Sequence, residues 1–294
     1  MNAPGTMGRA FAVGIVLNAA FVAAEAAAGV WINSLALVAD AGHNLSDVLS
    51  LALAWGATAL AQRQPSPRRT YGFRRTTILA SLVNAVFLLI VIGAIAREAV
   101  HRFGLPADVN GTAMSLVAAV GILVNGSTTL LFASGQRSDL NIKGAFLHMA
   151  GDTAVSAGVL ASGLIIAATG LTWIDPAMSL LITVLIALGT WSLLRDSANL
   201  ALDAVPGAID PAAVSQYLKG LPGVLTIHDL HIWAMSTTET ALTVHLVMPQ
   251  AAVDDAFLAR VSDGLEQAFG IRHATVQVEH EDEISHCCQR RPSA

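Results

Sequence analysis

The first two thirds of the chain consist of long apolar segments separated by short polar connections. Each segment has roughly 20 residues or more, the length that an α-helix needs to cross the hydrocarbon core of a bilayer. Residues 1–8 are polar and too weakly patterned for a cleaved signal, so we expect them to remain as a short tail. The pattern predicts a helical transmembrane domain over residues 9–202. We expect six helices in it, over residues 10–31, 35–61, 77–99, 111–134, 144–171 and 175–195.

The pattern changes from Asp203 onward, where apolar runs become short and two different periods alternate. Apolar residues at every second position predict strands, and apolar residues at helical spacing predict helices. The expected elements are a helix capped by Asp210 that ends at Leu218, strands over 224–233 and 240–248, a helix over 253–269 and a strand over 274–279. This αββαβ order is typical of a small α+β domain with its helices on one sheet face. We place that domain at residues 203–283 and a tail at 284–294.

The composition is that of an integral membrane protein. Hydrophobic residues make up 54% of the 294 positions and charged residues only 13%, and the mean hydropathy is +0.61. An ordinary soluble domain covers itself with more charge than this. The net charge of -5 argues against a nucleic-acid partner. Cys287 and Cys288 are adjacent, which excludes a long-range disulfide framework and leaves them as soft metal ligands or bystanders.

Basic residues indicate the orientation of the six helices. The great majority of those near the helix ends fall on one side of the membrane, and only Arg97 and Arg102 fall on the other. The first group contains Arg9, Arg63, Arg68, Arg69, Arg74, Arg75, Arg137, Lys143 and Arg195. Because positive residues concentrate on the inner side, we expect both termini in the cytoplasm. The expected location is the cell membrane, inner or plasma, which the chain crosses several times.

His43 and Asp47 interrupt the second apolar segment, and His148 and Asp152 interrupt the fifth at the same spacing. Residues i and i+4 lie on one face of a helix, about one turn apart. An ionisable group inside the bilayer costs on the order of 2.5–3.5 kcal/mol, so such groups usually face a partner, a cavity or an ion. The two helices are expected to run antiparallel, each in the middle of a three-helix half, as in transporters with inverted repeats. Imidazole and carboxylate together suit tetrahedral Zn²⁺, so we predict a four-ligand metal site.

An alternative interpretation is that each His–Asp pair is a hydrogen bond that merely fastens helices together. The repeated spacing on two antiparallel helices favours the metal site over this alternative. Asp40 lies one turn before His43, and we interpret it as a residue on the path of the ion. The alternatives are a hydrogen-bond acceptor for one of the metal ligands and a group at the helix end near the outer surface. Other polar residues in the apolar segments are interpreted as interhelical hydrogen-bonding groups. These are Asn18, Glu25, Asn84 and Asn125.

These motifs make the chain similar to the cation diffusion facilitator family, the zinc transporters that exchange metal for protons. The resemblance covers nearly the whole chain. It rests on Ser34-Leu-Ala-Leu-Val-Ala-Asp-Ala-Gly-His43-Asn-Leu-Ser-Asp47, Tyr71-Gly-Phe-Arg-Arg, His148-x-x-x-Asp152 and His228-Asp-Leu-His231-Ile-Trp233. It implies a homodimer, a zinc transport site made by His43, Asp47, His148 and Asp152, and a cytoplasmic metallochaperone-like domain. Residues 62–77 and 132–143 contain no histidine, unlike the corresponding loops of some members, so metal capture is not expected there.

The resemblance also implies a second metal site, in the soluble domain. The matching positions are His228, His245, His273 and Glu279, to which Cys287 and Cys288 of the tail would add thiolates from the same or the neighbouring protomer. His228 and His231 are three apart in a strand, which predicts opposite faces, so at most one serves a given site. Ala259 stands where some relatives bear a bridging histidine, which argues against a full dinuclear site. The alternative is a set of solvated surface histidines that bind no metal.

The predicted function is a Zn²⁺/H⁺ antiporter that exports zinc from the cytoplasm by alternating access. Metal binding requires neutral imidazole and ionised carboxylate and therefore releases protons. His43 and His148 are the expected proton carriers, because histidine titrates nearest physiological pH. Zinc on the soluble domain would act as a structural or regulatory ion that tightens the homodimer. Nitrogen and oxygen ligands leave Cd²⁺, Co²⁺ and Ni²⁺ open as further cargoes.

Two other functions compete with this prediction. An intramembrane zinc metalloenzyme is disfavoured, because the chain has no His-Glu-x-x-His and four protein ligands would close the open coordination position that catalysis needs. We therefore do not expect an enzyme. A passive metal channel or a zinc sensor is the third alternative, and the absence of proton counterflux during zinc movement would identify it.

Overall fold

The computed structural model describes residues 19–105, 107–133, 140–249 and 254–280. These residues form two compact units. The first lies within Met1–Leu53 and Val83–Leu193, and the second within Ala54–Leu82 and Leu194–Ala294. The first unit therefore contains most of the membrane helices, and the second contains the C-terminal domain together with the connection between the second and third helices.

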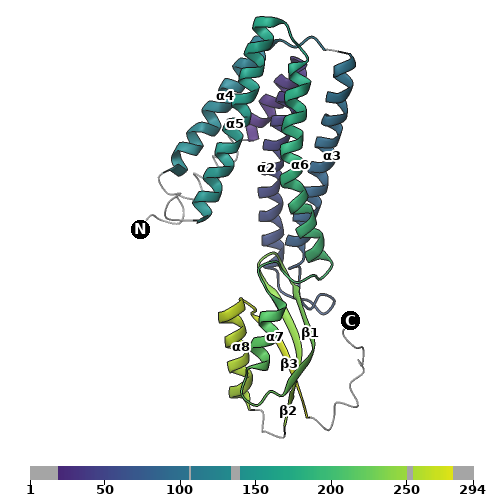
Figure 1. Ribbon diagram of the computed structural model, residues 1–294, viewed down its shortest axis with the longest axis vertical. Coiled ribbons are helices and arrows are strands. Elements are labelled where there is room, and N and C mark those ends of the chain that lie inside the picture. The colour runs from purple at the N-terminus through teal and green to yellow at the C-terminus, as the bar shows by residue number, and fades with distance from the viewer. Residues whose placement is uncertain (1–18, 106, 134–139, 250–253, 281–294) are drawn as a thin grey trace. The chain divides into compact units, whose positions relative to one another are not determined.

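A helix occupies each of the six apolar segments (Figure 1). They are a first helix over Ala19–Trp31, α2 over Leu35–Ala61, α3 over Thr76–Gly104, α4 over Gly111–Ala133, α5 over Leu140–Thr169 and α6 over Ile174–Ala201. Among the described residues, α2, α3, α6 and the Phe146–Thr169 part of α5 are long and apolar enough to cross a membrane. The first helix and α4 are also apolar, but their described apolar stretches, Ala19–Trp31 and Gly111–Ser127, are shorter. The helical membrane domain predicted from the hydrophobic pattern is confirmed.

Small residues bring α4 and α5 together. A Cβ atom on Gly111 would lie 2.5 Å from the carbonyl oxygen of Gly163, and a Cβ atom on Gly163 would lie 2.6 Å from Ser115 Oγ. Because neither position has room for a side chain, glycine allows the two backbones to approach closely, as small residues do between membrane helices. The two helices lie side by side along their length (Figure 1). This packing fixes α5, the helix that carries His148 and Asp152.

Asp175, in the first turn of α6, caps the beginning of α2 from a distant part of the chain. Its Oδ1 accepts hydrogen bonds from Ser34 Oγ at 2.6 Å and from the Ala36 N–H at 3.2 Å, and its Oδ2 accepts one from the Leu35 N–H at 2.8 Å. The first N–H groups of a helix have no partner within the helix, and a carboxylate both satisfies them and interacts favourably with the helix dipole. Asp175 therefore holds the start of α2, the helix that carries His43 and Asp47.

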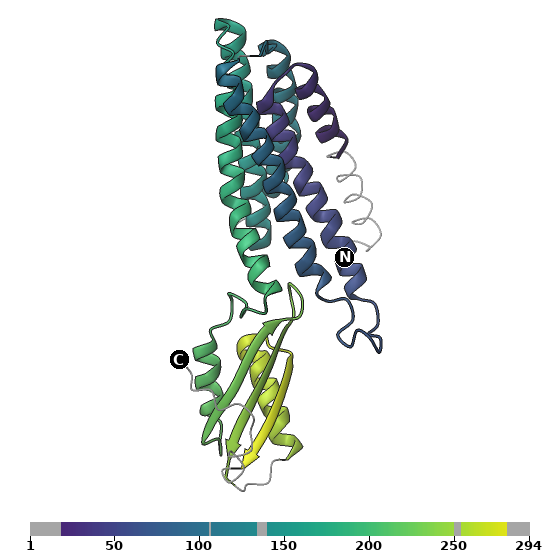
Figure 2. The ribbon, with the colours of Figure 1, turned by 90° about the vertical axis from the view of Figure 1, so that its right-hand side faces the viewer.

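The C-terminal domain has the αββαβ order that the sequence predicts (Figure 2). Its elements are α7 over Pro211–Lys219, β1 over Thr226–Ala234, β2 over Thr240–Met248, α8 over Asp255–Phe269 and β3 over His273–His280. In the sheet, β2 is central, antiparallel to β1 and parallel to β3. Asp210 and Asp254 cap the two helices by accepting hydrogen bonds from backbone N–H groups in their first turns.

Both helices of this domain pack on the same face of the sheet. One buried apolar cluster joins residues of α7 and α8 to every second residue of β2. Its members include Val214, Leu218, Phe257, Val261, Leu265, Leu242, Val244 and Leu246. Side chains alternate along a strand, so His245, between the buried Val244 and Leu246, lies on the face that the helices leave uncovered.

A β-bulge in β1 changes the predicted positions of two histidines. His228 pairs with His245, and His231 pairs with Thr243, so three steps along β1 oppose two steps along β2. Asp229, inside the bulge, has a positive φ of 53°. Directly opposed residues of an antiparallel pair share a face. His228 and His231 therefore lie on the same face, and the prediction of opposite faces was wrong because the extra residue resets the alternation.

The connection between α2 and α3 belongs to the same compact unit as the C-terminal domain. Arg74 Nη1 lies 3.0 Å from Glu239 Oε2 in the turn between β1 and β2, and Arg75 pairs with Asp203. The Thr237 N–H donates a hydrogen bond to Thr77 Oγ1 at 3.1 Å. Exposed ion pairs of this kind contribute about 0–1 kcal/mol each. Arginines of the loop that indicated the orientation of the helices are thus bonded to residues of the C-terminal region.

Candidate metal centre

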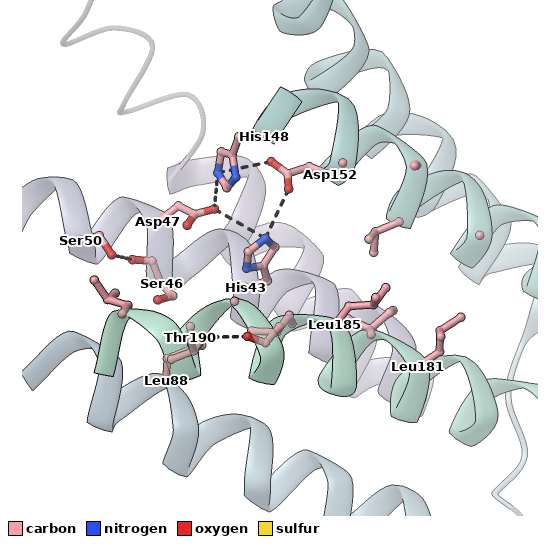
Figure 3. A pocket seen from close by; sticks show the side chains of 18 of the residues that line it. His43, Ser46, Asp47, Ser50, Leu88, His148, Asp152, Leu181, Leu185 and Thr190 are labelled. Atoms are coloured by element: carbon pink, nitrogen blue, oxygen red, sulfur yellow. Dashed lines mark hydrogen bonds and ion pairs between the residues drawn. The ribbon is translucent and has the colours of Figure 1, made fainter. Parts of the chain in front are cut away.

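His43 and Asp47 on α2 meet His148 and Asp152 on α5 (Figure 3). Across the helices, His43 Nε2 lies 3.3 Å from Asp152 Oδ1, and His148 Nε2 lies 3.2 Å from Asp47 Oδ2. Within each helix, the His–Asp distances are 4.0 Å on α2 and 3.8 Å on α5. Each imidazole therefore approaches both carboxylates. We call these four residues the membrane tetrad.

The spacing of the tetrad is close to that of a metal site. Donor atoms of His43, Asp47 and His148 all lie within 4.8 Å of one another. Ligand atoms around a tetrahedral Zn²⁺ lie about 3.4 Å apart, as metal–ligand distances of about 2.0–2.2 Å require. The two rings lie edge to face with centroids 5.9 Å apart, so they do not block each other. Small side-chain movements would bring the donors to a common ion.

Burial differs between the four side chains and leaves one carboxylate oxygen unsatisfied. The Asp152 side chain is only 4% exposed, whereas that of His148 is 45% exposed. Asp152 Oδ2 and His43 Nδ1 are buried and have no hydrogen-bond partner among the residues that the structure describes. A buried carboxylate oxygen without a donor is costly, and a bound cation is one way to satisfy it. The donor set and its unmet oxygen therefore both fit a cation.

The tetrad lines one wall of a cavity of about 750 Å³ in the first unit. The facing wall is apolar and comes mainly from α6, where Leu181, Leu185 and Ile186 line it (Figure 3). Asn84 on α3 also borders the cavity, and its Nδ2 donates a hydrogen bond to Ser50 Oγ on α2 at 2.6 Å. This confirms the prediction that Asn84 forms an interhelical hydrogen bond. Among the described residues that line the cavity, the ionisable side chains are those of the tetrad.

Asp40 and Glu25 lie beside the tetrad and are almost completely buried, at 0% and 2% exposure. Asp40 Oδ2 accepts a hydrogen bond from Ser156 Oγ at 3.1 Å, and Glu25 Oε2 accepts one from Asn44 Nδ2 at 3.5 Å. The two carboxyl groups are close enough to interact with each other. The hydrogen bond from Asn44 on α2 confirms the prediction that Glu25 forms an interhelical hydrogen bond, and the structure also places Glu25 beside a second buried carboxyl group.

A second cluster lies on the uncovered face of the C-terminal sheet. His228 Nε2 is 2.9 Å from Glu279 Oε2, and His245 Nδ1 is 2.7 Å from Glu279 Oε1. Gln277 Nε2 also donates to Glu279 Oε1 at 2.9 Å and orients the carboxylate. His228, His245 and Glu279 each offer a donor atom within 4.8 Å of the other two. We call these three residues the C-terminal cluster.

Two family models match the chain. The cation efflux transmembrane domain matches residues 11–200, and the cytoplasmic domain of cation efflux proteins matches residues 206–281. The first match alone covers more than half of the chain. The chain belongs to the cation efflux family. The membrane tetrad thus lies in the transmembrane domain of a cation efflux protein, and the C-terminal cluster in its cytoplasmic domain.

Relatives of this cation efflux protein are transporters rather than enzymes. The metal cation efflux system protein CzcD of Cupriavidus metallidurans is 39% identical over 277 residues, which cover 94% of this chain and 88% of that protein. The zinc transporter ZitB of Escherichia coli is 36% identical, with coverages of 90% and 85%. A cadmium, cobalt and zinc/H(+)-K(+) antiporter of Bacillus subtilis is 32% identical, with coverages of 92% and 88%. The solved structure of the metal-bound C-terminal domain of the CzcD transporter is 38% identical in sequence. The match covers 24% of this chain and 99% of that domain, with a TM-score of 0.23.

The cation efflux protein does not bring all the predicted C-terminal ligands together. His273 begins β3 opposite Ala241, whereas Glu279 pairs with Val247 near the other end of the strand. The His273 ring instead packs against Tyr71, with centroids 5.7 Å apart. His273 shares a face with Glu279 but is too distant along the strand to join the C-terminal cluster, which corrects that prediction. Cys287 and Cys288 lie outside the described residues.

Sequence reasoning missed the roles of two acidic residues of this cation efflux protein. Asp229 Oδ2 lies 3.7 Å from His245 Nε2, and its Oδ1 lies 2.8 Å from His231 Nε2. Its position between two histidines in the sequence was an available signal. Asp175 was missed as well, although an acidic residue at the start of an apolar segment is a common helix-start feature. Its partners on α2 are distant in sequence, so the pattern did not reveal the contact.

Proposed function

We propose that this protein exports zinc from the cytoplasm in exchange for protons, and that the membrane tetrad is its transport site. The observation that carries the proposal is the convergence of two His–Asp pairs from α2 and α5 on one wall of a cavity within a cation efflux transmembrane domain. The printed names of the relatives, which include a zinc transporter and a zinc/H(+)-K(+) antiporter, support zinc as cargo and protons as counter-ion.

The chemistry of the tetrad couples zinc to protons. Zn²⁺ needs neutral imidazoles and ionised carboxylates, so binding expels protons, and protonation from the opposite side expels the metal. His43 and His148 carry the exchanged protons, since histidine titrates nearest physiological pH. Asp47 and Asp152 supply negative charge that makes a divalent cation tolerable inside the membrane. Alternating access then exposes the loaded tetrad to each side in turn.

The C-terminal cluster provides a second zinc site in this proposal. Two imidazoles and one carboxylate leave a fourth tetrahedral position open for water or for a ligand from a partner. Zinc there stabilises a homodimer and shifts the transport equilibrium only to the extent that it binds one state more tightly than the other. The ion is regulatory or structural at this site, in contrast to the transported ion at the tetrad.

The proposed orientation places both termini and the C-terminal domain in the cytoplasm of a cell that carries the protein in its inner or plasma membrane. Support comes from the arginine-rich connection between α2 and α3, which shares a compact unit with the C-terminal domain. Positive residues of short connections favour the inner side. Cd²⁺, Co²⁺ and Ni²⁺ are further cargoes to be tested, because the names of relatives include cadmium and cobalt.

The test is zinc uptake into proteoliposomes with an imposed pH gradient, with a zinc indicator and a pH-sensitive dye in the same vesicles. The wild type is expected to move zinc and protons in opposite directions. Asp152→Asn is expected to abolish uptake, because the amide removes the most buried charge of the tetrad. Glu98→Gln removes a carboxylate on α3, away from the tetrad. It is the matched control and is expected to transport normally. Undiminished uptake by Asp152→Asn would refute the site, and zinc movement without proton counterflux would favour a channel.

A further inference from the structure

Glu25 and Asp40 are two buried carboxyl groups that the proposed transport chemistry does not use. Glu25 Oε1 and Asp40 Oδ1 are fully buried and accept no hydrogen bond in the structure. Their other oxygens accept one hydrogen bond each, from Asn44 and Ser156, and both of these donors are neutral. The pair therefore has two unmet acceptor atoms and no basic partner among the described residues.

The pair lies one layer beyond the membrane tetrad on the same two antiparallel helices. Asp40 precedes His43 by three residues on α2, and its partner Ser156 follows Asp152 by four residues on α5. Three or four residues correspond to one helical turn, roughly 5 Å along the helix axis. Among the described residues, no ion pair joins Asp40 or Glu25 to a tetrad member, so the pair and the tetrad are neighbouring but separate groups.

The burial of two neighbouring carboxyl groups favours a cation, such as a proton, shared between them. Two like charges in a shared buried site cannot both be tolerated, and one of the two then keeps a proton. A proton on one carboxyl group converts it into a donor for the other, which satisfies both unmet oxygens with a single hydrogen bond. The titratable groups that act on the pair from neighbouring positions are His43 on α2 and Asp152 on α5. Both belong to the tetrad, so the charge of the tetrad acts directly on the pair.

We propose that Glu25 and Asp40 form a second cation site that holds one shared proton in the metal-free protein and releases it when a divalent cation occupies the tetrad. This inference rests on the proposed function, and it adds one proton to those that the protein exchanges for each zinc ion. A divalent ion one turn away stabilises the fully ionised pair, so the proton passes to water and two carboxylates remain. With the proposed orientation, α2 begins at the outer side, which places the pair between the tetrad and the exit. The pair is thus a counter-ion site on the route that the metal takes outward.

The experiment measures protons released on zinc binding by the purified full-length protein, from calorimetric titrations in buffers of different ionisation enthalpy. Glu25→Gln is expected to release about one proton fewer per zinc than the wild type. Asp40→Asn is the second variant, with the same expectation, in case Glu25→Gln does not fold. Glu98→Gln is the matched control and is expected to release as many protons as the wild type. Proton release by both pair variants at the wild-type level overturns the proposal.

Infrared difference spectroscopy of the wild type tests the shared proton without any substitution. A protonated-carboxyl band is expected in the metal-free protein and is expected to disappear on zinc addition. The band is also expected to be absent from Glu25→Gln and present in Glu98→Gln. A band that persists unchanged in the zinc-loaded wild type overturns the proposal, as does one that survives in Glu25→Gln. Failure of the antiport proposal is separate, because it would show as zinc transport by the wild type without proton counterflux.

Discussion

Asp175 Oδ1 accepts a hydrogen bond from Ser34 Oγ at 2.6 Å, although 141 positions separate the two residues in the chain. The same carboxylate accepts hydrogen bonds from the first backbone N–H groups of α2. This contact ties the start of the helix that bears His43 and Asp47 to the first turn of α6. We therefore expect a displacement of α6 at this end to move the helix that carries one half of the membrane tetrad.

Asp175→Asn is expected to lower the free energy of unfolding by about 1.5–3 kcal/mol, the range for buried hydrogen bonds to a charged group. The amide keeps one acceptor but turns a donor toward the N–H groups of α2. Unfolding of the detergent-solubilised protein measures the change. Asp196→Asn removes an exposed carboxylate from the same helix and is expected to change the free energy by less than about 0.5 kcal/mol. Equal effects of the two substitutions would contradict the capping role.

His43→Asp is expected to change metal preference rather than only weaken binding. The variant tetrad has one imidazole and three carboxylates, and oxygen ligands favour harder ions such as Mn²⁺ over Zn²⁺. Competition binding with Zn²⁺, Cd²⁺ and Mn²⁺ to the purified protein measures the ratio of affinities. His101→Asp changes a histidine in the last turn of α3 and serves as the control. An unaltered Zn²⁺ to Mn²⁺ ratio in His43→Asp would argue that the imidazole is not a ligand.

Zinc affinity at the tetrad is expected to fall as the pH falls. At acidic pH each imidazole takes a proton that competes with the metal, because Zn²⁺ binds only the neutral ring. Each histidine that must lose a proton contributes up to about a tenfold loss of affinity per pH unit in this range. Zinc titrations between pH 5 and pH 8 would measure the slope. His148→Ala should give a shallower slope, and a pH-independent affinity in the wild type would exclude histidine ligation.

Glu279→Gln is expected to remove about one zinc ion per chain from the full-length protein while the tetrad still binds its own. Glu279 contacts both His228 and His245, so the substitution removes the one carboxylate of the C-terminal cluster and leaves two imidazoles. Equilibrium dialysis gives the number of bound ions, and sedimentation gives the dimer fraction with and without zinc. His273→Ala at the far end of β3 is the control and should retain the wild-type zinc content.

Gly111→Ala is expected to destabilise the packing of α4 against α5 by about 1–3 kcal/mol, as overpacking does. The added Cβ would meet backbone atoms of α5, which cannot move aside as a flexible side chain can. Gly93→Ala on α3 is the control, because among the described residues no atom beyond its own stretch of helix lies within 4 Å of its Cβ position. The control is expected to gain up to about 1 kcal/mol from helix propensity. Thermal unfolding in detergent separates the two outcomes.

The hydrophobic pattern predicted the elements well because burial and membrane insertion both act on local sequence. Strand β2 begins at Thr240 and ends at Met248, as the alternation indicated, and a helix occupies each apolar segment. The tetrad could be predicted for a related reason: the repeated His-x-x-x-Asp spacing is local on each helix, and only the pairing of the two helices had to be inferred.

The hydrophobic pattern could not predict contacts between residues that are distant in the sequence. The cap that Asp175 provides depends on where α6 begins relative to α2, and the pairing of Glu25 with Asp40 depends on which faces the first helix and α2 present to each other. His273 was assigned to the C-terminal site from the resemblance to the family, although six residues along one extended strand place it roughly 20 Å from Glu279. Side-chain chemistry alone could not predict the Asp175 cap or the pairing of Glu25 with Asp40.

The bulge at Asp229 gives β1 one residue more than its pairing with β2 requires. Deletion of a single residue there would restore simple alternation and leave the following residues on their present faces, with Ile232 in the apolar core and Trp233 on the opposite face. An insertion or deletion that the bulge does not absorb would instead move every later residue of the strand to the other face. We therefore expect natural variation in the length of β1 to concentrate at the bulge, while the rest of the strand varies by replacement.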